Sequence, residues 1–159
     1  MIIKGLIDED FSNYKIPSMF IAFPYCSFKC CKEQNLPIKT CQNCELAQIK
    51  DIEVSVNNIV NRFLSNPITT SVVVGGMEPF DSWTDLELLI NTFRQHTEVT
   101  IVIYSGYKEE EIQDKINKLK HYSNIIIKFG RYIPNQQPHF DEILGVQLAS
   151  PNQYARKIS

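Results

Sequence analysis

Five cysteines are the residues of this 159-residue chain with the most evident chemistry. All of them fall in one short segment, at Cys26, Cys30, Cys31, Cys41 and Cys44. Thiolate sulfur is a soft ligand that suits iron–sulfur clusters, zinc and Cu(I), and thiolates a few residues apart can converge from one loop. Because no cysteine lies elsewhere to link distant parts of the fold, the pattern argues against a disulfide framework and favours metal binding or redox chemistry.

The spacing of the cysteines leaves more than one kind of site open. A structural zinc ion takes four ligands in a tetrahedron, and Cys26-x3-Cys30 with Cys41-x2-Cys44 could supply four sulfurs. Redox-sensing or merely buried thiols are a further interpretation. An iron–sulfur cluster is the interpretation that the rest of the sequence favours.

Short apolar strands alternate with helices along the chain. The pattern predicts strands over residues 19–24, 71–74, 99–104 and 124–129, with a fifth at 143–148. It predicts helices over residues 54–64, from Asp81 or Ser82 through Phe93, and over 108–119. This alternation indicates βαβ units and an α/β fold, which we expect to be a partial (open) β/α barrel with a mainly parallel sheet.

Three segments whose residues could take part in binding or catalysis each follow a predicted strand. These are the cysteine loop, the glycine-containing segment 75–79 and the turn at 105–107. In parallel α/β folds the loops after the carboxyl ends of strands gather on one face, so we expect the three segments to meet there. The length fits one domain over residues 1–159, with a cluster loop at 24–47.

Charge and hydropathy exclude several classes of function. The formal net charge is −2 and the charged residues are mixed in sign, which gives no electrostatic footprint for nucleic acid or an anionic membrane. Apolar residues make up 43% of the chain, but no window approaches 18 unbroken apolar residues. We therefore expect a cytoplasmic protein with no nucleic-acid or membrane partner.

Two motifs point to a known superfamily. Phe23-Pro24-Tyr25-Cys26-Ser27-Phe28-Lys29-Cys30 and Gly75-Gly76-Met77-Glu78-Pro79 resemble two signatures of the radical S-adenosylmethionine superfamily. A closed zinc site predicts no such second motif. Over nearly its whole length the chain resembles the small activating enzymes of anaerobic ribonucleotide reductases, through softer motifs at residues 10–14, 103–107, 130–132 and 148–153.

The resemblance implies a complete activity. A [4Fe-4S] cluster held by three cysteines would bind S-adenosylmethionine at its fourth iron, and one electron would split the carbon–sulfur bond. The products would be methionine and a 5′-deoxyadenosyl radical, which would leave a glycyl radical on a large partner enzyme, an anaerobic ribonucleotide reductase. The resemblance also implies a low-potential electron donor such as flavodoxin or ferredoxin. The alternative is a noncatalytic metal-binding module that holds zinc or an Fe–S cluster.

The third cluster ligand departs from the superfamily pattern. The usual Cys-x3-Cys-x2-Cys spacing places it at Glu33, which is not a soft ligand. We expect Cys26, Cys30 and Cys41, since widening the gap from two residues to ten adds only about 1.4 kcal/mol of closure entropy. Cys44 in place of Cys41 stays open, as does a set of Cys31, Cys41 and Cys44.

The resemblance also implies residues for S-adenosylmethionine. Glu78 would accept a hydrogen bond from its amino group, and Gly75 and Gly76 would let the backbone approach the methionine moiety. Alternatively, Glu78 only helps the next helix to begin. Met77 is an insertion relative to the usual Gly-Gly-Glu, and the sequence leaves its effect on Glu78 open.

Two softer assignments complete the predicted site. Phe28 would pack near the adenine, or would instead anchor the loop. Ser105 would hydrogen-bond the cofactor, or would instead be an ordinary turn residue before Gly106.

Overall fold

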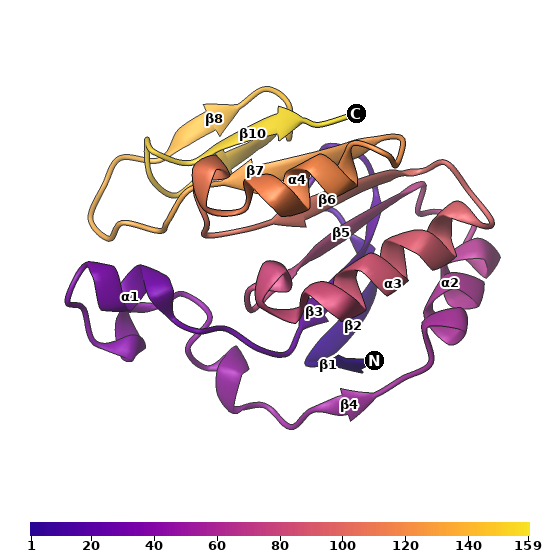
Figure 1. Ribbon diagram of the computed structural model, residues 1–159, viewed down its shortest axis with the longest axis horizontal. Coiled ribbons are helices and arrows are strands. Elements are labelled where there is room, and N and C mark those ends of the chain that lie inside the picture. Colours follow the sequence, from indigo (N-terminus) through magenta and orange to yellow (C-terminus); the bar gives the residue numbers. More distant parts are fainter.

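The computed structural model describes residues 1–159 and is built around one six-stranded sheet (Figure 1). The strand order is β10-β7-β6-β5-β3-β2. The strands are β2 (Gly5–Asp10), β3 (Ser18–Phe23), β5 (Ser71–Gly76), β6 (Thr100–Tyr104), β7 (Ile125–Phe129) and β10 (Tyr154–Lys157). Two small antiparallel sheets are formed by β1 (Ile2–Ile3) with β4 (Ile52–Glu53), and by β8 (His139–Asp141) with β9 (Val146–Leu148).

The expected partial (open) β/α barrel with a mainly parallel sheet is wrong. The strands β3, β5, β6 and β7 pair in parallel, but β2 and β10 pair antiparallel at the two edges. The chain has four antiparallel pairings and three parallel ones, and the sheet does not close. The edge strands escaped prediction because their sequences, GLIDED and YARK, are short and charged, as is common at sheet edges, and lack the apolar run of a buried strand.

The predicted helices are present, with shifted ends. They are α2 (Val56–Ser65), α3 (Trp83–Arg94) and α4 (Gln113–Leu119), with the short α1 (Lys29–Glu33) in the cysteine loop. Single 3-10 turns cover η1 (Ile38–Thr40), η2 (Leu46–Gln48), η3 (Pro79–Ser82) and η4 (Glu109–Glu111). The helix expected over 108–119 is split into η4 and α4 because Ile112, with φ −127°, leaves the helical conformation. None of the helices combines the length and apolar character that crossing a membrane requires.

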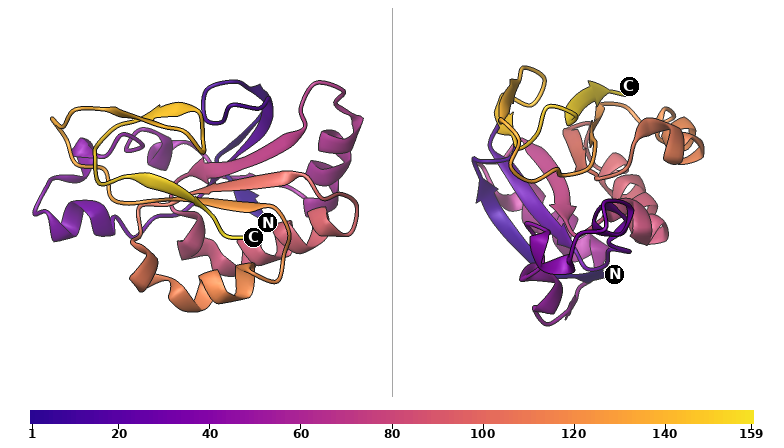
Figure 2. Two further views of the ribbon diagram at one scale, coloured as in Figure 1. Left: turned by 90° about the horizontal axis from the view of Figure 1, so that it is seen from above. Right: turned by 90° about the vertical axis from the view of Figure 1, so that its left-hand side faces the viewer.

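Apolar side chains cover the two faces of the sheet in different ways. On one face, α2, α3 and α4 pack against β3, β5, β6 and β7 to form the larger core, and α3 buries Leu86, Leu89, Ile90 and Phe93. On the other face, Leu144 and Leu148 from the β8–β9 hairpin pack with Tyr14 on Val73 and Val102. Figure 2 shows the helices and the hairpin on opposite sides of the sheet.

The four parallel strands all end on the same side, where α1 lies, while α2 lies at the far end (Figure 1). Phe23 at the end of β3 pairs with Gly76 at the end of β5, and Tyr104 of β6 pairs with Lys128 of β7. The expectation that the three segments meet is confirmed, since the Glu78 N–H donates to the Tyr25 carbonyl (2.9 Å) and the Gly106 N–H to the Glu78 carboxylate (2.8 Å).

Candidate metal centre

A cavity of about 590 Å³ lies at the carboxyl ends of the parallel strands. Seven of the eight predicted site residues line it, namely Cys26, Cys30, Cys41, Gly75, Gly76, Glu78 and Ser105. Phe28 does not. The fold therefore brings cysteines from two parts of the loop together with the ends of β5 and β6.

Two of the cavity thiols receive backbone hydrogen bonds. The Phe28 N–H donates to Cys26 Sγ (3.2 Å) and the Asn43 N–H to Cys41 Sγ (3.4 Å). Hydrogen bonds to sulfur are one of the ways in which proteins tune iron–sulfur clusters. Phe28 begins α1 in the left-handed conformation (φ 54°), so its observed contribution is made by its backbone, and packing of its side chain near an adenine stays a prediction.

The two remaining cysteines lie away from the cavity. Cys31 is buried, and burial together with the neighbouring Cys41 and Cys44 raises the pKa of its thiol, while Cys44 Sγ lies 3.6 Å from the Lys39 carbonyl. Neither residue lines the cavity, whereas Cys26, Cys30 and Cys41 do, and the choice of the three cluster ligands stays a prediction. Nowhere do three or more Cys, His, Asp or Glu side chains converge closely enough to hold a single metal ion.

The sulfur of Cys30 packs against the bare backbone of Gly106. A Cβ at position 106 would lie 2.8 Å from Cys30 Sγ, closer than a Cβ normally approaches another heavy atom. Burial raises the pKa of Cys30 and, together with nearby carboxylates, raises the pKa of Cys26 to about 12. In the metal-free protein Cys26 and Cys30 therefore hold their protons, which they release when a cluster binds.

Glu78 presents a buried carboxylate to this cavity. Its Oε1 accepts hydrogen bonds from the Phe80 N–H (3.1 Å) and Ser105 Oγ (3.0 Å), and its Oε2 accepts one from the Gly106 N–H (2.8 Å). Burial raises the pKa of Glu78 to about 7, although the three donors act in the opposite direction. The bond to Phe80 caps η3, so Glu78 both begins this turn and lines the cavity.

The Met77 insertion does not remove Glu78 from the cavity. Gly76 adopts φ +80°, and a Cβ there would lie 2.8 Å from the Cα of Ala22. This close pairing continues one residue further, where the Met77 N–H donates to the Phe23 carbonyl (3.2 Å) and the Met77 side chain is buried. The extra residue is absorbed as an extension of the contact between β3 and β5.

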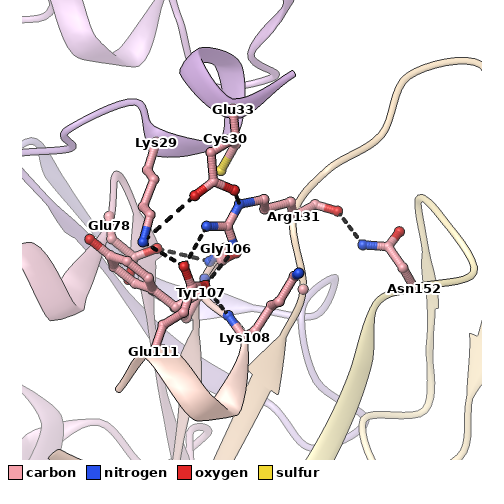
Figure 3. Close-up of polar contacts among 12 residues, drawn as sticks. Lys29, Cys30, Glu33, Glu78, Gly106, Tyr107, Lys108, Glu111, Arg131 and Asn152 are labelled. Carbon is pink, nitrogen blue, oxygen red and sulfur yellow. Dashed lines mark hydrogen bonds and ion pairs between the residues drawn. The ribbon is translucent and has the colours of Figure 1, made fainter. Parts of the chain in front are cut away.

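An ion-pair network that the sequence did not predict holds α1 against the strand ends (Figure 3). The buried Arg131 guanidinium binds both carboxylate oxygens of Glu111 (2.6 and 2.7 Å), and its Nε lies 2.6 Å from Glu33 Oε2. Lys29 Nζ also reaches Glu111 (2.5 Å), and Asn152 Nδ2 donates to the Arg131 carbonyl (2.8 Å). Glu33, at the position where the superfamily has its third cysteine, is thus an ion-pair partner of Arg131.

Lys128 is a second residue that sequence reasoning missed. It is buried in β7, lines the cavity, and donates from Nζ to the carbonyls of Gly130 (3.0 Å) and Ser105 (3.3 Å). Burial lowers the pKa of Lys128 to about 8. A lysine inside the apolar run IIIKF was the signal that could have revealed it, since lysine is rarely fully buried unless its charge is paired.

Comparison with known proteins defines the class of cofactor. The family model of the 4Fe-4S single cluster domain matches residues 18–148, most of the chain. The chain belongs to this family. The matched region runs from β3 to β9 and includes all five cysteines, and it identifies the protein as one that binds a 4Fe-4S cluster. No curated protein and no solved structure matches the chain.

The cavity residues of this 4Fe-4S protein fit such a cluster. Three soft thiols face one volume from two directions, and two of them already have backbone N–H donors. The third, Cys30, has room for its sulfur only because residue 106 lacks a side chain.

Proposed function

We propose that this 4Fe-4S protein is a radical S-adenosylmethionine enzyme that installs a glycyl radical on a partner enzyme, an anaerobic ribonucleotide reductase. The observation that carries the proposal is the single cavity lined both by three cysteines and by the turn from Gly75 to Glu78. A cluster needs only the thiols. A buried carboxylate beside them indicates a second ligand with a positive charge.

The proposed reaction depends on the transfer of a single electron through the cluster to S-adenosylmethionine. A [4Fe-4S] cluster held by three thiolates offers one iron without a protein ligand and passes on an electron from a low-potential donor such as flavodoxin or ferredoxin. That electron would break the carbon–sulfur bond of S-adenosylmethionine, giving methionine and a 5′-deoxyadenosyl radical. The radical would take a hydrogen atom from a glycine Cα of the partner and become 5′-deoxyadenosine, so that the unpaired electron would remain on the partner.

The chain contributes ligands and a counter-charge. Cys26, Cys30 and Cys41 would hold three irons, and Glu78 would accept the ammonium group of the methionine moiety. With a pKa of about 7, Glu78 holds a proton in part of the free protein at neutral pH. A bound cation favours the carboxylate, so binding is accompanied by release of that proton.

The backbone next to Glu78 leaves room for a ligand to approach it closely. Gly75 and Gly76 carry no side chain on this wall, and the Gly76 carbonyl accepts a hydrogen bond from Asn43 Nδ2 (2.5 Å). Asn43 lies between Cys41 and Cys44, so this bond ties the second half of the cysteine loop to the strand end. Ser105 would complete the wall through its hydroxyl, which already binds Glu78.

Electron paramagnetic resonance tests this function. The reconstituted protein is incubated without oxygen with reductant, S-adenosylmethionine and an anaerobic ribonucleotide reductase, and 5′-deoxyadenosine is measured in the same samples. We expect a glycyl doublet that requires all components and is absent with Glu78→Ala. Cluster formation without 5′-deoxyadenosine would reject the enzyme and support a noncatalytic cluster module. Formation of 5′-deoxyadenosine without the doublet would reject this partner only.

A further inference from the structure

The walls of the cavity carry one buried carboxyl group and one buried amine. Among the residues that line the cavity, Glu78 has the only carboxyl group and Lys128 the only amine. Both are buried, with exposed fractions of 7% each. Because burying either charge is costly, their presence in one cavity calls for an explanation.

The carboxylate of Glu78 attracts the ammonium of Lys128 but does not contact it directly. No ion pair joins them, although both bind Ser105. Ser105 Oγ donates to Glu78 (3.0 Å), and the Ser105 carbonyl accepts from Lys128 Nζ (3.3 Å). One residue therefore separates the acid from the base along the cavity wall.

The ammonium of Lys128 also has bonding capacity left. It has three N–H donors, and its protein acceptors are two neutral carbonyls, those of Ser105 and Gly130. Every other strongly buried cation of the chain has a carboxylate partner, since Lys4 binds Asp51 and Arg131 binds Glu33 and Glu111. Lys128 is thus the strongly buried cation of this chain that has no carboxylate in direct ion-pair contact.

We propose that Lys128 binds the carboxylate of an α-amino acid moiety whose ammonium group is bound by Glu78. This assignment rests on the proposed function and extends it, because the methionine end of S-adenosylmethionine is such a moiety. Ser105 spaces the two charges, so that one wall of the cavity is complementary to a zwitterion. A ligand that has the amino group but lacks the carboxylate leaves Lys128 without its anion.

The expected effect is large enough to measure. A hydrogen bond between charged groups contributes on the order of tenfold to a hundredfold in affinity. The preference for a ligand with the carboxylate over one without it therefore depends on Lys128 by at least about tenfold. A purely structural role of Lys128 would lower the affinity for both ligands equally.

Titration calorimetry without oxygen or reductant tests the assignment on the cluster-loaded protein. The probes are S-adenosylmethionine and decarboxylated S-adenosylmethionine, which keeps the amine and the sulfonium. Lys128→Met removes the charge at similar volume, and Lys128→Gln is the second variant should the first not fold. Lys120→Met, at an exposed lysine outside the cavity, is the matched control.

We expect the wild type and Lys120→Met to share a strong preference for the carboxylated probe, and the Lys128 variants to lose at least about tenfold of it. An equal loss for both probes, or a changed reduction potential with an unchanged preference, would overturn the assignment. A wild-type preference below about tenfold would overturn it whatever the variants do. A wild type that binds neither probe would instead reject the proposed function.

Discussion

Cys30 and Gly106 show how closely single residues are fitted at the metal centre. The backbone of Gly106 lies outside the left-handed region, so an alanine there meets no backbone strain. Its Cβ would nevertheless lie 2.8 Å from Cys30 Sγ. The sulfur must therefore shift if residue 106 gains a side chain, while the rest of the fold is left in place.

We expect Gly106→Ala to lower the iron content of the anaerobically reconstituted protein severalfold without changing its circular dichroism. Gly5→Ala is the matched control, because a Cβ at Gly5 meets no atom within 4 Å. Iron and labile sulfide analysis of both variants checks this. Full iron content in Gly106→Ala would mean that Cys30 does not hold the cluster in the position described.

The five cysteines should differ in importance according to their places. Cys26→Ala, Cys30→Ala and Cys41→Ala each remove a thiol that lines the cavity, so we expect loss of the brown colour and of most iron. Cys31→Ala and Cys44→Ala should retain the cluster, since neither residue lines the cavity. The visible absorption of the five variants measures cluster content. A colourless Cys44→Ala beside a brown Cys41→Ala would show that Cys44, and not Cys41, is the third cluster ligand.

Residue types and spacing predicted most of the residues of the site but missed the charged residues Arg131 and Lys128. The cysteines, Gly76 and Glu78 were identified because their motifs are local in sequence. Arg131 was not, because its partners Glu33 and Glu111 lie 98 and 20 residues away, and only the fold brings them together.

At the scale of elements, α3 illustrates what periodicity predicts well. Its apolar residues recur on one face and are buried against the sheet, with Phe93 in edge contact with Phe63 (5.4 Å between ring centroids). Burial of this face, and not helix propensity, holds the helix in place.

Two adjacent leucines of α3 provide a matched pair. Leu89 is fully buried, whereas Leu88 is 48% exposed. We expect Leu89→Ala to lower the free energy of unfolding by about 2–5 kcal/mol and Leu88→Ala by less than about 0.5 kcal/mol. Urea denaturation of the metal-free proteins measures both, and similar losses would contradict the described orientation of α3.

The network around Arg131 predicts a pH dependence of stability. Hydrogen bonds from Arg131 and then Lys29 hold the pKa of Glu111 well below its usual range. A carboxyl group with a lowered pKa in the fold stabilises it above the unfolded value, about 4.3, and this contribution is lost as the pH falls. We expect Glu111→Gln to be less stable than wild type at pH 7, and the difference to shrink between about pH 5 and pH 3.

Denaturation of the metal-free protein at several pH values checks this expectation. Glu110→Gln is the control, because Glu110 is exposed in the same turn and has no ion pair. A difference between wild type and Glu111→Gln that is independent of pH would show that Glu111 acts through packing alone.

At the scale of the whole molecule, the parallel core of the sheet is enough to assemble the site. The four strands with apolar or β-branched runs were predicted, and the positions of the loops after them follow from their parallel pairing. The barrel was predicted wrongly because nothing in GLIDED or YARK indicates a strand, and these two edges are antiparallel. The cavity sits at the carboxyl ends of the central strands, so the error at the edges did not displace it.

The cavity also depends on both layers that flank the sheet. The β8–β9 hairpin contributes Val146 and Leu148 to its lining, while the loop around α1 contributes the cysteines. Segments more than a hundred residues apart in the chain thus enclose one volume. Local motifs identify the candidate cluster ligands, but only the fold brings together the distant segments that enclose the cavity.

Mössbauer spectroscopy of protein reconstituted with ⁵⁷Fe, before and after addition of S-adenosylmethionine, tests the central claim most directly. The account predicts a four-iron cluster in which one iron of the four changes its spectrum when S-adenosylmethionine binds, and no such change in Glu78→Ala. Four irons that S-adenosylmethionine leaves unchanged in the wild type, or a protein that takes up zinc in place of the cluster, would contradict it.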